Sequence, residues 1–196
     1  IATPEGMTFA VIDDEGTTAK AIAGTHFTEP EYTGKEWPLA DVRLLAPMLP
    51  SKVVAIGRNY ADHAAEMGND VPEEPMMFLV PNTAVVGPDD PVVIPTALTS
   101  EVHYEGELAV IIGRMCKDVE PEEAKKVIFG YTIANDVTAR DLQRGDGQWA
   151  RAKGFDTFCP LGPWIETDLD PQDVDIVTTR DGEVCQDGHS SDMVHG

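Results

Sequence analysis

The sequence predicts a mainly β fold of the α+β class, with a few helices at its periphery. Three observations lead to this prediction: apolar runs of strand length are short and frequent, helical segments are few, and the chain contains 15 prolines. Prolines interrupt helices and the interiors of long strands, so they favour many short strands joined by turns. This pattern is typical of a β architecture rather than of a helical bundle.

Two domains are expected, a small N-terminal domain at residues 1–49 and a larger one at residues 50–196. A proline-bounded connector that ends at Pro50 predicts the soft boundary between them. The chain begins at Ile1 without a Met and ends without a terminating pattern. We therefore expect a piece of a longer protein, short at the start of the first domain and at the end of the second.

Local patterns predict the elements of both domains. Short apolar runs bounded by turn residues predict strands at 7–12, 52–57, 76–80, 92–95, 105–112 and 128–135, and a strand pair around 180–182. Helix formers that end at a glycine predict a helix at 59–67, and a proline followed by acidic residues predicts another at 121–127. The polar, Gly-containing stretch 137–153 predicts a mobile loop or a short helix, which could act as a lid.

Acidic residues dominate the charge. The chain has 35 Asp and Glu against 14 Lys and Arg, which gives a formal net charge of −21 and a pI near 4.3. Such a surface repels phosphate backbones and anionic lipid head groups, so nucleic acids and membranes are not expected as partners. The same field opposes an anionic substrate, so a site for an acid needs local positive charge from a metal ion or from Lys and Arg.

The cysteines indicate a reducing environment. Cys116, Cys159 and Cys185 are odd in number and widely spaced, which matches neither a disulfide framework nor a zinc pattern. No apolar run approaches the ~20 residues of a membrane span, and no signal peptide opens the chain. We therefore expect a cytoplasmic protein.

Glu105 and Glu107 are the strongest candidates for a functional feature. Residues two apart in a strand point to the same face, so these carboxylates project together, ~7 Å apart at the backbone. Ala109 and Ile111 continue that face and are apolar, which indicates a partly buried surface. A divalent cation would neutralise the pair, and oxygen ligands favour Mg²⁺, Mn²⁺ or Ca²⁺ over zinc. The alternative is a solvated strand face or a sheet edge.

Two further residues are candidates for the same site. Asp136 ends the apolar strand 128–135 and is the natural third ligand, although a turn-capping aspartate is the alternative. Lys153 lies in an aromatic, glycine-containing stretch that includes Trp149, where a desolvated cation could face an anionic substrate. An ordinary solvated lysine is the alternative.

His63 and Glu66 have the spacing of a catalytic pair. Three residues apart on the helix predicted at 59–67, they share a face. A carboxylate that accepts a hydrogen bond from one ring nitrogen leaves the other nitrogen free to act as a base. The alternative is a surface histidine with a neighbouring glutamate. A cupin-type metal site that uses His103 and Glu105 is a competing hypothesis, but no second histidine follows until His189.

Four ordered stretches resemble motifs of the fumarylacetoacetate hydrolase family. They are 57–63 (GRNYADH), 103–110 (HYEGELAV), 135–141 (NDVTARD) and 152–156 (AKGFD). The resemblance covers the chain from about residue 40 to its end, and four motifs in order are more specific than any one of them.

The resemblance implies a β-sandwich roll with a small N-terminal domain, in a homodimer, and a Thr-Gly-Thr-Pro substrate loop that this chain does not reach. It implies Mg²⁺ or Mn²⁺ as the cofactor and a small anionic 2-oxo acid as the substrate. The residues it implies are Glu105, Glu107 and Asp136 as metal ligands, His63 and Glu66 as a dyad, Lys153 as a cation near the reacting carbonyl, and Arg58, Tyr60, Arg140 and Gln143 as substrate contacts.

The function that we expect is metal-dependent cleavage of a C–C bond in a small 2-oxo acid through a stabilised pyruvate enolate. Oxaloacetate decarboxylation and acylpyruvate hydrolysis are its two forms. Isomerisation of 2-hydroxyhepta-2,4-diene-1,7-dioate is the alternative, because it uses a related enolic intermediate. A second alternative is a family member that binds a metal or metabolite without catalysis.

Overall fold

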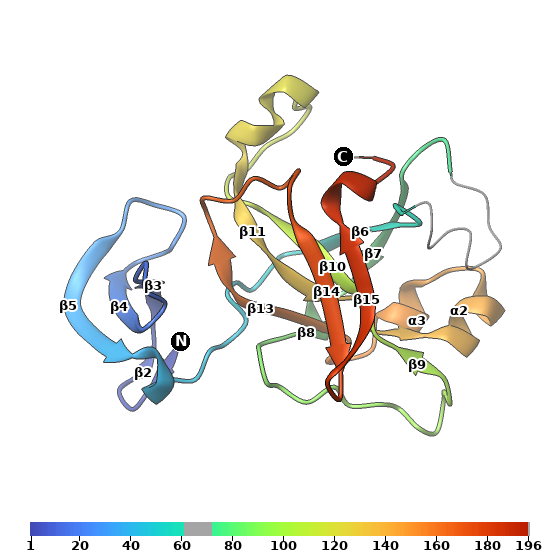
Figure 1. Ribbon diagram of the computed structural model, residues 1–196, viewed down its shortest axis with the longest axis horizontal. Helices are drawn as coiled ribbons and strands as arrows, with labels where there is room; N and C mark the ends of the chain where they lie inside the picture. Colours follow the sequence, from blue (N-terminus) through green and yellow to red (C-terminus); the bar gives the residue numbers. More distant parts are fainter. Residues whose placement is uncertain (61–71, 196) are drawn as a thin grey trace.

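The computed structural model describes residues 1–60 and 72–195 (Figure 1). As the sequence predicts, the protein is mainly β. The strands are β1 (Ala2–Thr3), β2 (Gly6–Met7), β3 (Phe9–Ile12), β4 (Thr18–Ala23), β5 (Glu31–Pro38), β6 (Val53–Gly57), β7 (Met76–Val80), β8 (Val85–Val86), β9 (Val102–His103), β10 (Gly106–Ile112), β11 (Ile128–Asn135), β12 (Thr138–Ala139), β13 (Cys159–Glu166), β14 (Asp175–Arg180) and β15 (Glu183–His189). The α-helices are α2 (Arg140–Asp146) and α3 (Ala150–Lys153), and the 3-10 helices are η1 (Leu39–Asp41), η2 (Asn82–Ala84), η3 (Pro121–Lys126) and η4 (Ser190–Asp192).

The N-terminal strands gather at one end of the molecule (Figure 1). There β3, β4 and β5 form an antiparallel sheet, and β1 pairs with β2. The middle strand β4, which pairs with a strand on each side, buries Ala19, Ala21 and Ile22.

The larger part of the chain is built on a sheet with strand order β10-β11-β13-β8. Its first three strands are antiparallel, and β8 adds to β13 in parallel. Gly130 of β11 allows β13 to approach, since a Cβ there would lie 2.5 Å from the Glu166 carbonyl oxygen. The β14–β15 hairpin contacts β10, and β9 pairs with β12 beside the end of the same sheet. These additions surround the ends of β10 and β11, where the candidate site residues lie.

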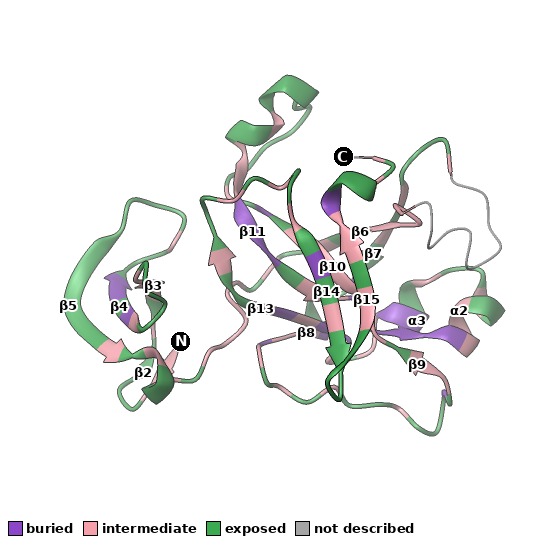
Figure 2. Cartoon of the chain, viewed as in Figure 1, coloured by how far each residue is buried: buried purple, intermediate pink, exposed green. Residues whose placement is uncertain are grey.

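Buried and exposed residues alternate at the end of β10, whereas the outer strand β5 is mostly exposed (Figure 2). Ile111 is 5% exposed, whereas Val110 and Ile112 are 49% and 48% exposed. The period of two therefore holds, and the face that carries Glu107 is the inner one. A core cluster of Val137, Ala139 and Phe158 includes a residue of β12, the strand that pairs with β9.

Most of the predicted elements match the structure. The strands predicted at 52–57, 76–80, 105–112 and 128–135 correspond to β6, β7, β10 and β11, the pair around 180–182 to β14 and β15, and the strand at 7–12 to β2 and β3, which Thr8 separates. The predicted helix at 59–67 falls largely on residues 61–71, outside the described residues.

One prediction is wrong, and the structure makes two others more specific. The strand predicted at 92–95 is wrong: these residues form a loop that prolines bound on both sides, and the Val93 N–H donates to Thr157 Oγ1 instead of to a strand. The helix predicted at 121–127 is the 3-10 helix η3, which ends at Lys126, since a segment this short gains few i to i−4 bonds. Of the two alternatives for 137–153, the short helix matches the structure, which has α2 and α3 there after the short strand β12.

No helix within residues 1–60 and 72–195 has the length and apolar character that a membrane crossing requires.

His26 connects the N-terminal part to the central sheet through aromatic contacts. Its ring centroid lies 4.6 Å from that of Phe9, 4.0 Å from Phe27 and 5.5 Å from Phe129 of β11. Both ring nitrogens are buried and have no hydrogen-bond partner among the described residues. Burial lowers the pKa of His26 from the ordinary value of 6.5 because the charged ring would lose its solvation there.

Stability should therefore depend on pH through His26. Because its pKa is lower in the folded state, this contribution is present above pH 6.5 and is lost as pH falls through the folded-state pKa. We expect the free energy of unfolding in urea to fall more between about pH 7.5 and 5.5 in the wild type than in His26→Leu. His103→Leu, at an exposed position, is the matched control and should keep the pH profile of the wild type. A His26→Leu profile identical to that of the wild type would contradict the prediction.

Candidate metal and substrate site

The register of the sheet brings Glu105, Glu107 and Asp136 onto one face. Glu107 stands opposite Ala134 in the β10–β11 ladder. The Asp136 N–H donates to the Glu105 carbonyl at 2.9 Å, so these two residues continue the ladder and face one another. Directly opposed residues share a face, as do residues two apart along a strand. The three carboxyl groups therefore point to the same side.

The carboxyl oxygens are close enough to share one ion. One oxygen from each of Glu105, Glu107 and Asp136 lies within 4.8 Å of the others. Asp136 is only 5% exposed, and Glu107 is partly buried on the inner face. An all-oxygen, strongly acidic set of this kind fits Mg²⁺ or Mn²⁺. The solvated strand face and the turn-capping aspartate, which were the alternatives from the sequence, do not match this geometry.

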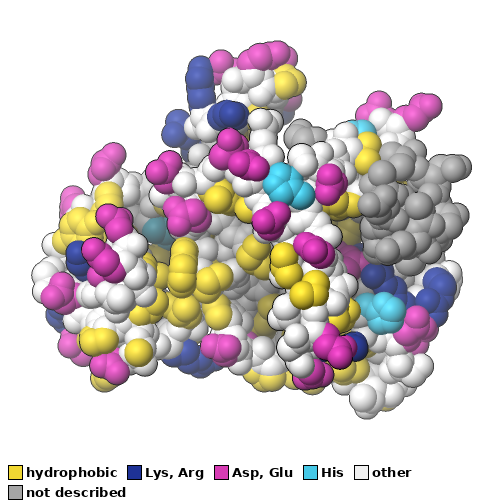
Figure 3. Space-filling model, in the orientation of Figure 1, with side chains coloured by type: hydrophobic (Ala, Val, Ile, Leu, Met, Phe, Trp, Pro, Cys, Tyr) yellow, Lys and Arg dark blue, Asp and Glu magenta, His cyan; other side chains and the backbone are white. Residues whose placement is uncertain are grey.

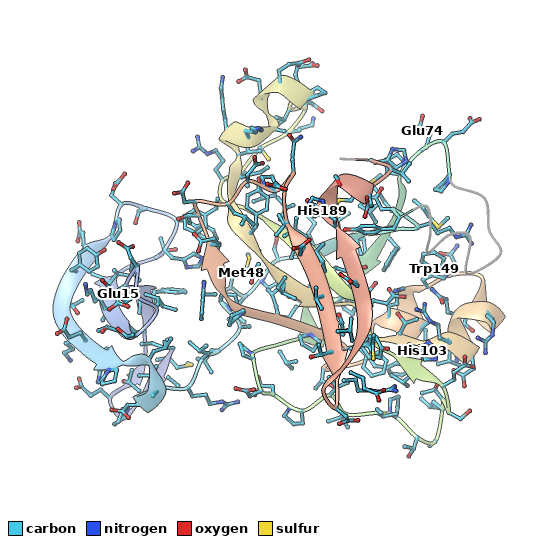
Figure 4. The ribbon with its side chains drawn as sticks, in the orientation of Figure 1. Glu15, Met48, Glu74, His103, Trp149 and His189 are labelled. Atoms are coloured by element: carbon cyan, nitrogen blue, oxygen red, sulfur yellow. The ribbon has the colours of Figure 1, made fainter. Side chains whose placement is uncertain are left out.

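Lys153 reaches this cluster from the end of α3. Its ammonium donates to Glu105 Oε2 at 2.8 Å, to Asp136 Oδ2 at 2.5 Å and to Thr138 Oγ1 at 2.8 Å. The residue is 2% exposed, so the alternative of a solvated lysine is wrong. Aromatic rings border the ammonium, which lies 5.2 Å from the ring centroid of Phe78 and 6.0 Å from that of Trp149 at the start of α3 (Figure 4).

Arg140 forms a second cationic contact at the cluster. Its guanidinium pairs with Glu105, and it also donates to Gln143 Oε1 at 2.9 Å. Arg140 is buried at the start of α2. The two predicted substrate contacts, Arg140 and Gln143, thus lie together beside one of the three carboxylates.

The site carries more negative charge than its buried cations balance. Burial raises the pKa of Glu107 to about 8, and the neighbouring carboxylates of Asp136 and Glu105 add to the rise. Burial also raises the pKa of Asp136 to about 6, although Lys153 opposes that rise. A divalent ion would favour the ionised form of both groups. The excess negative charge of the site therefore suits a metal ion, and its oxygen donor atoms do as well.

The remaining predicted contacts border the same region. The Tyr60 hydroxyl is buried without a partner among the described residues, and burial together with Glu107 raises the pKa of Tyr60. The Arg58 guanidinium lies 5.8 Å from the ring centroid of Trp149. Arg58 has a φ of +57°, an uncommon conformation for a residue with a side chain.

Other predicted residues are not part of the described cluster. His63 and Glu66 lie outside the described residues. His103 sits on β9 (Figure 4), where its ring nitrogen lies 3.8 Å from Glu101, and no cupin-type set forms around it in the described part of the chain. Cys159 is buried, and burial followed by the charges of Asp136 and Glu107 raises its thiol pKa to about 12.

Side chains outside the predicted set hold the backbone between the glutamates. Asn135 Oδ1 accepts a hydrogen bond from the Glu105 N–H at 3.0 Å, and Gln186 Oε1 of β15 accepts one from the Gly106 N–H at 2.7 Å. These two residues and Thr138 are not among the site residues that the sequence predicts. Thr138 has a signal that could have found it, since it lies two residues after Asp136, whereas the position of Gln186 depends on how the hairpin packs.

Replacing Gly106 by alanine should disturb this arrangement. The added Cβ would lie 2.3 Å from Thr178 Oγ1. We expect the free energy of unfolding to fall by about 1–3 kcal/mol, as overpacking does, and Mn²⁺ binding to weaken. Gly188→Ala is the matched control, because a Cβ there meets nothing within 4 Å. Adding Thr178→Ala should relieve the defect, and an equal loss in both glycine variants would contradict this account.

Comparisons with known proteins agree on one family. The family model "Fumarylacetoacetate (FAA) hydrolase C-terminal" matches residues 52–196, and the model "Rv2993c-like, N-terminal" matches residues 1–47. Protein Rv2993c of Mycobacterium tuberculosis is 56% identical over an alignment of 203 residues, which covers 100% of this chain and 76% of that protein. The oxaloacetate tautomerase YisK of Bacillus subtilis is 43% identical over 165 residues, which cover 81% of this chain and 55% of YisK.

Two solved structures are similar over nearly the whole chain, and a third is similar over most of it. The 2-hydroxyhepta-2,4-diene-1,7-dioate isomerase of Mycobacterium marinum is 53% identical with a TM-score of 0.89, over 100% of this chain and 75% of that one. The 5-carboxymethyl-2-hydroxymuconate delta-isomerase of Mycobacterium smegmatis is 55% identical with a TM-score of 0.91, over 99% and 76%. A maleylpyruvate hydrolase of Sphingobium, solved with manganese(II) and pyruvate, is 37% identical with a TM-score of 0.68, over 82% and 56%.

Proposed function

We propose that this chain, which belongs to the fumarylacetoacetate hydrolase family, is a divalent-metal-dependent isomerase or tautomerase of small 2-oxo acids. The observation that carries the proposal is the convergence of Glu105, Glu107 and Asp136 with the buried ammonium of Lys153. This arrangement offers an ion site and a protein cation at the same place, which is what an acid with an adjacent carbonyl requires.

The three carboxylates would hold Mg²⁺ or Mn²⁺. A bound ion of this kind polarises the carbonyl oxygen of a 2-oxo acid. Acidic side chains are spread over the visible face of the molecule (Figure 3), so an anionic substrate is repelled by most of the surface. Lys153 and Arg140 supply positive charge at the site itself. The Tyr60 hydroxyl has no hydrogen-bond partner among the described residues, so it is available to donate a hydrogen bond to a substrate.

The reaction that we propose moves a proton and breaks no C–C bond. A base takes a proton from the carbon next to the carbonyl, the C–H electron pair forms the C=C bond, and the carbonyl oxygen gains a proton. The product has the same atoms as the substrate. Lys153 would stabilise the negative charge that develops on that oxygen. His63, which the sequence predicts to share a helix face with Glu66, is our candidate for the base.

The sequence alone favours C–C bond cleavage, whereas the names of relatives support isomerisation. YisK and the human mitochondrial FAHD2A, which is 44% identical, are oxaloacetate tautomerases, and two structures at 53% and 55% identity are named isomerases. C–C hydrolysis is the second candidate, because the maleylpyruvate hydrolase at 37% identity was solved with manganese(II) and pyruvate.

Product analysis distinguishes these functions. The protein is incubated with the enol form of oxaloacetate, with 2-hydroxyhepta-2,4-diene-1,7-dioate and with an acylpyruvate, each with Mn²⁺ or with EDTA. We expect chelator-sensitive keto–enol conversion or double-bond migration, observed as a change in ultraviolet absorbance, without pyruvate release. Stoichiometric pyruvate would favour the hydrolase or decarboxylase instead, and no turnover despite Mn²⁺ binding would favour the non-catalytic alternative.

We also propose the homodimer and the cytoplasmic location expected from the sequence. Sedimentation of the purified protein at micromolar concentration tests the dimer, for which a single species at twice the chain mass is expected.

A further inference from the structure

Thr138 makes a contact that no function assigned so far explains. Its side chain is fully buried on β12, with 0% exposure. The hydroxyl accepts a hydrogen bond from the Lys153 ammonium at 2.8 Å and donates one to the Asp136 carbonyl oxygen at 2.9 Å. Both the proton and an acceptor lone pair of the hydroxyl are therefore used, so its orientation is fixed.

The acceptors of Lys153 differ in kind. Glu105 and Asp136 offer carboxylate oxygens, and both belong to the proposed ion site. Thr138 offers a neutral hydroxyl, which is not among the three ligand groups. An ion that binds the two carboxylates competes with the ammonium for their oxygens, but it does not compete for the hydroxyl.

We infer that Thr138 is a positioning residue, which holds the Lys153 ammonium beside the ion and lets the carboxylates turn toward the metal. The inference rests on the proposed function, because it assumes that an ion binds Glu105, Glu107 and Asp136. Without the hydroxyl, the ammonium either retains carboxylate oxygens that the ion needs or loses a hydrogen bond in a buried site. Both outcomes weaken ion binding.

A double-mutant cycle in Mn²⁺ affinity tests this role. Thr138→Val, Lys153→Met and the double variant are compared with the wild type, and Kd is measured by EDTA competition from the Mn²⁺-loaded protein, at a temperature where circular dichroism shows that each variant stays folded after the metal is removed. We expect Thr138→Val to raise the Kd about tenfold, as the loss of a residue that orients a ligand does. In the Lys153→Met background, Thr138→Val should leave the Kd unchanged, since the hydroxyl then has no ammonium to hold.

Two further variants separate positioning from general packing. Thr138→Ser keeps the hydroxyl and should restore the wild-type Kd within about twofold. Thr132→Val is the matched control, because Thr132 is also buried on the neighbouring strand β11 but its hydroxyl has no partner among the described residues. An equal loss of affinity from Thr138→Val in both backgrounds, or no loss in the wild-type background, would overturn the inference.

The cycle does not depend on turnover. If the wild type binds Mn²⁺ but moves no proton in any substrate, the proposed isomerase function fails, whereas the cycle still decides whether Thr138 acts through Lys153.

Discussion

Glu107→Gln is expected to abolish binding of Mg²⁺ and Mn²⁺ while making the metal-free protein more stable at pH 7 than the wild type, whose Glu107 stays protonated in the folded state at a pH where it ionises in the unfolded chain. Because the pKa of Glu107 is raised to about 8, its carboxyl group is mostly protonated in the metal-free protein at pH 7. Glutamine has the same shape and the same lack of charge, so it should fit in the same place. It cannot become the anionic ligand that the ion requires.

Thermal unfolding with and without Mn²⁺ measures this effect. At a free ion concentration of about 100 times Kd, binding stabilises the folded state by about 2.7 kcal/mol. For a chain of this size, that corresponds to a rise in Tm of about 5–10 °C. We expect this rise in the wild type and none in Glu107→Gln. Glu183→Gln makes the same charge change at an exposed position of β15 and should retain the full shift.

The same variant tests the electrostatics of the empty site. Because the pKa of Glu107 is raised from 4.5 to about 8 in the folded state, its contribution to stability is present below pH 4.5 and is lost as pH rises toward 8. The free energy of unfolding of the metal-free wild type should therefore decrease over this window more steeply than that of Glu107→Gln. Parallel profiles for the two proteins would show that Glu107 ionises as it does in the unfolded chain.

The sequence predicted the carboxylates of the site better than it predicted their support. A strand period of two was enough to place Glu105 and Glu107 on one face. Their meeting with Asp136 depends on the register between β10 and β11, which long-range pairing sets and which a single strand does not encode. The predicted strand at 92–95 failed because apolar residues alone do not supply a partner strand.

The depth of Lys153 shows the same limit. A helix of four residues has no periodic pattern that would reveal which side it buries. The ammonium is enclosed because Phe78 of β7 and Trp149 pack over it, and Phe78 is 75 positions away in the sequence. Local patterns therefore identify such a residue only as a candidate, and the fold decides its environment.

Lys153→Met is expected to destabilise the metal-free protein and to lower turnover even when the ion restores stability. Lys153 is 2% exposed, and its ammonium donates hydrogen bonds to both Glu105 and Asp136. Removing one partner of such a buried ionic network costs about 3–5 kcal/mol, because the remaining carboxylates lose their counter-charge. Lys126→Met is the matched control: its ammonium pairs with Glu123 at the surface, where an ion pair contributes about 0–1 kcal/mol.

Saturating Mn²⁺ separates the two roles of Lys153. The ion supplies the missing positive charge, so Lys153→Met should regain most of the wild-type Tm and bind Mn²⁺ at least as tightly as the wild type, since no ammonium competes for the carboxylates. Turnover should nevertheless stay lower by about 10²–10³, the usual loss when a group that stabilises developing charge is removed. A Mn²⁺-loaded Lys153→Met with wild-type turnover would show that the ammonium serves only to balance charge, and a metal-free variant as stable as the wild type would show that it does not balance charge at all.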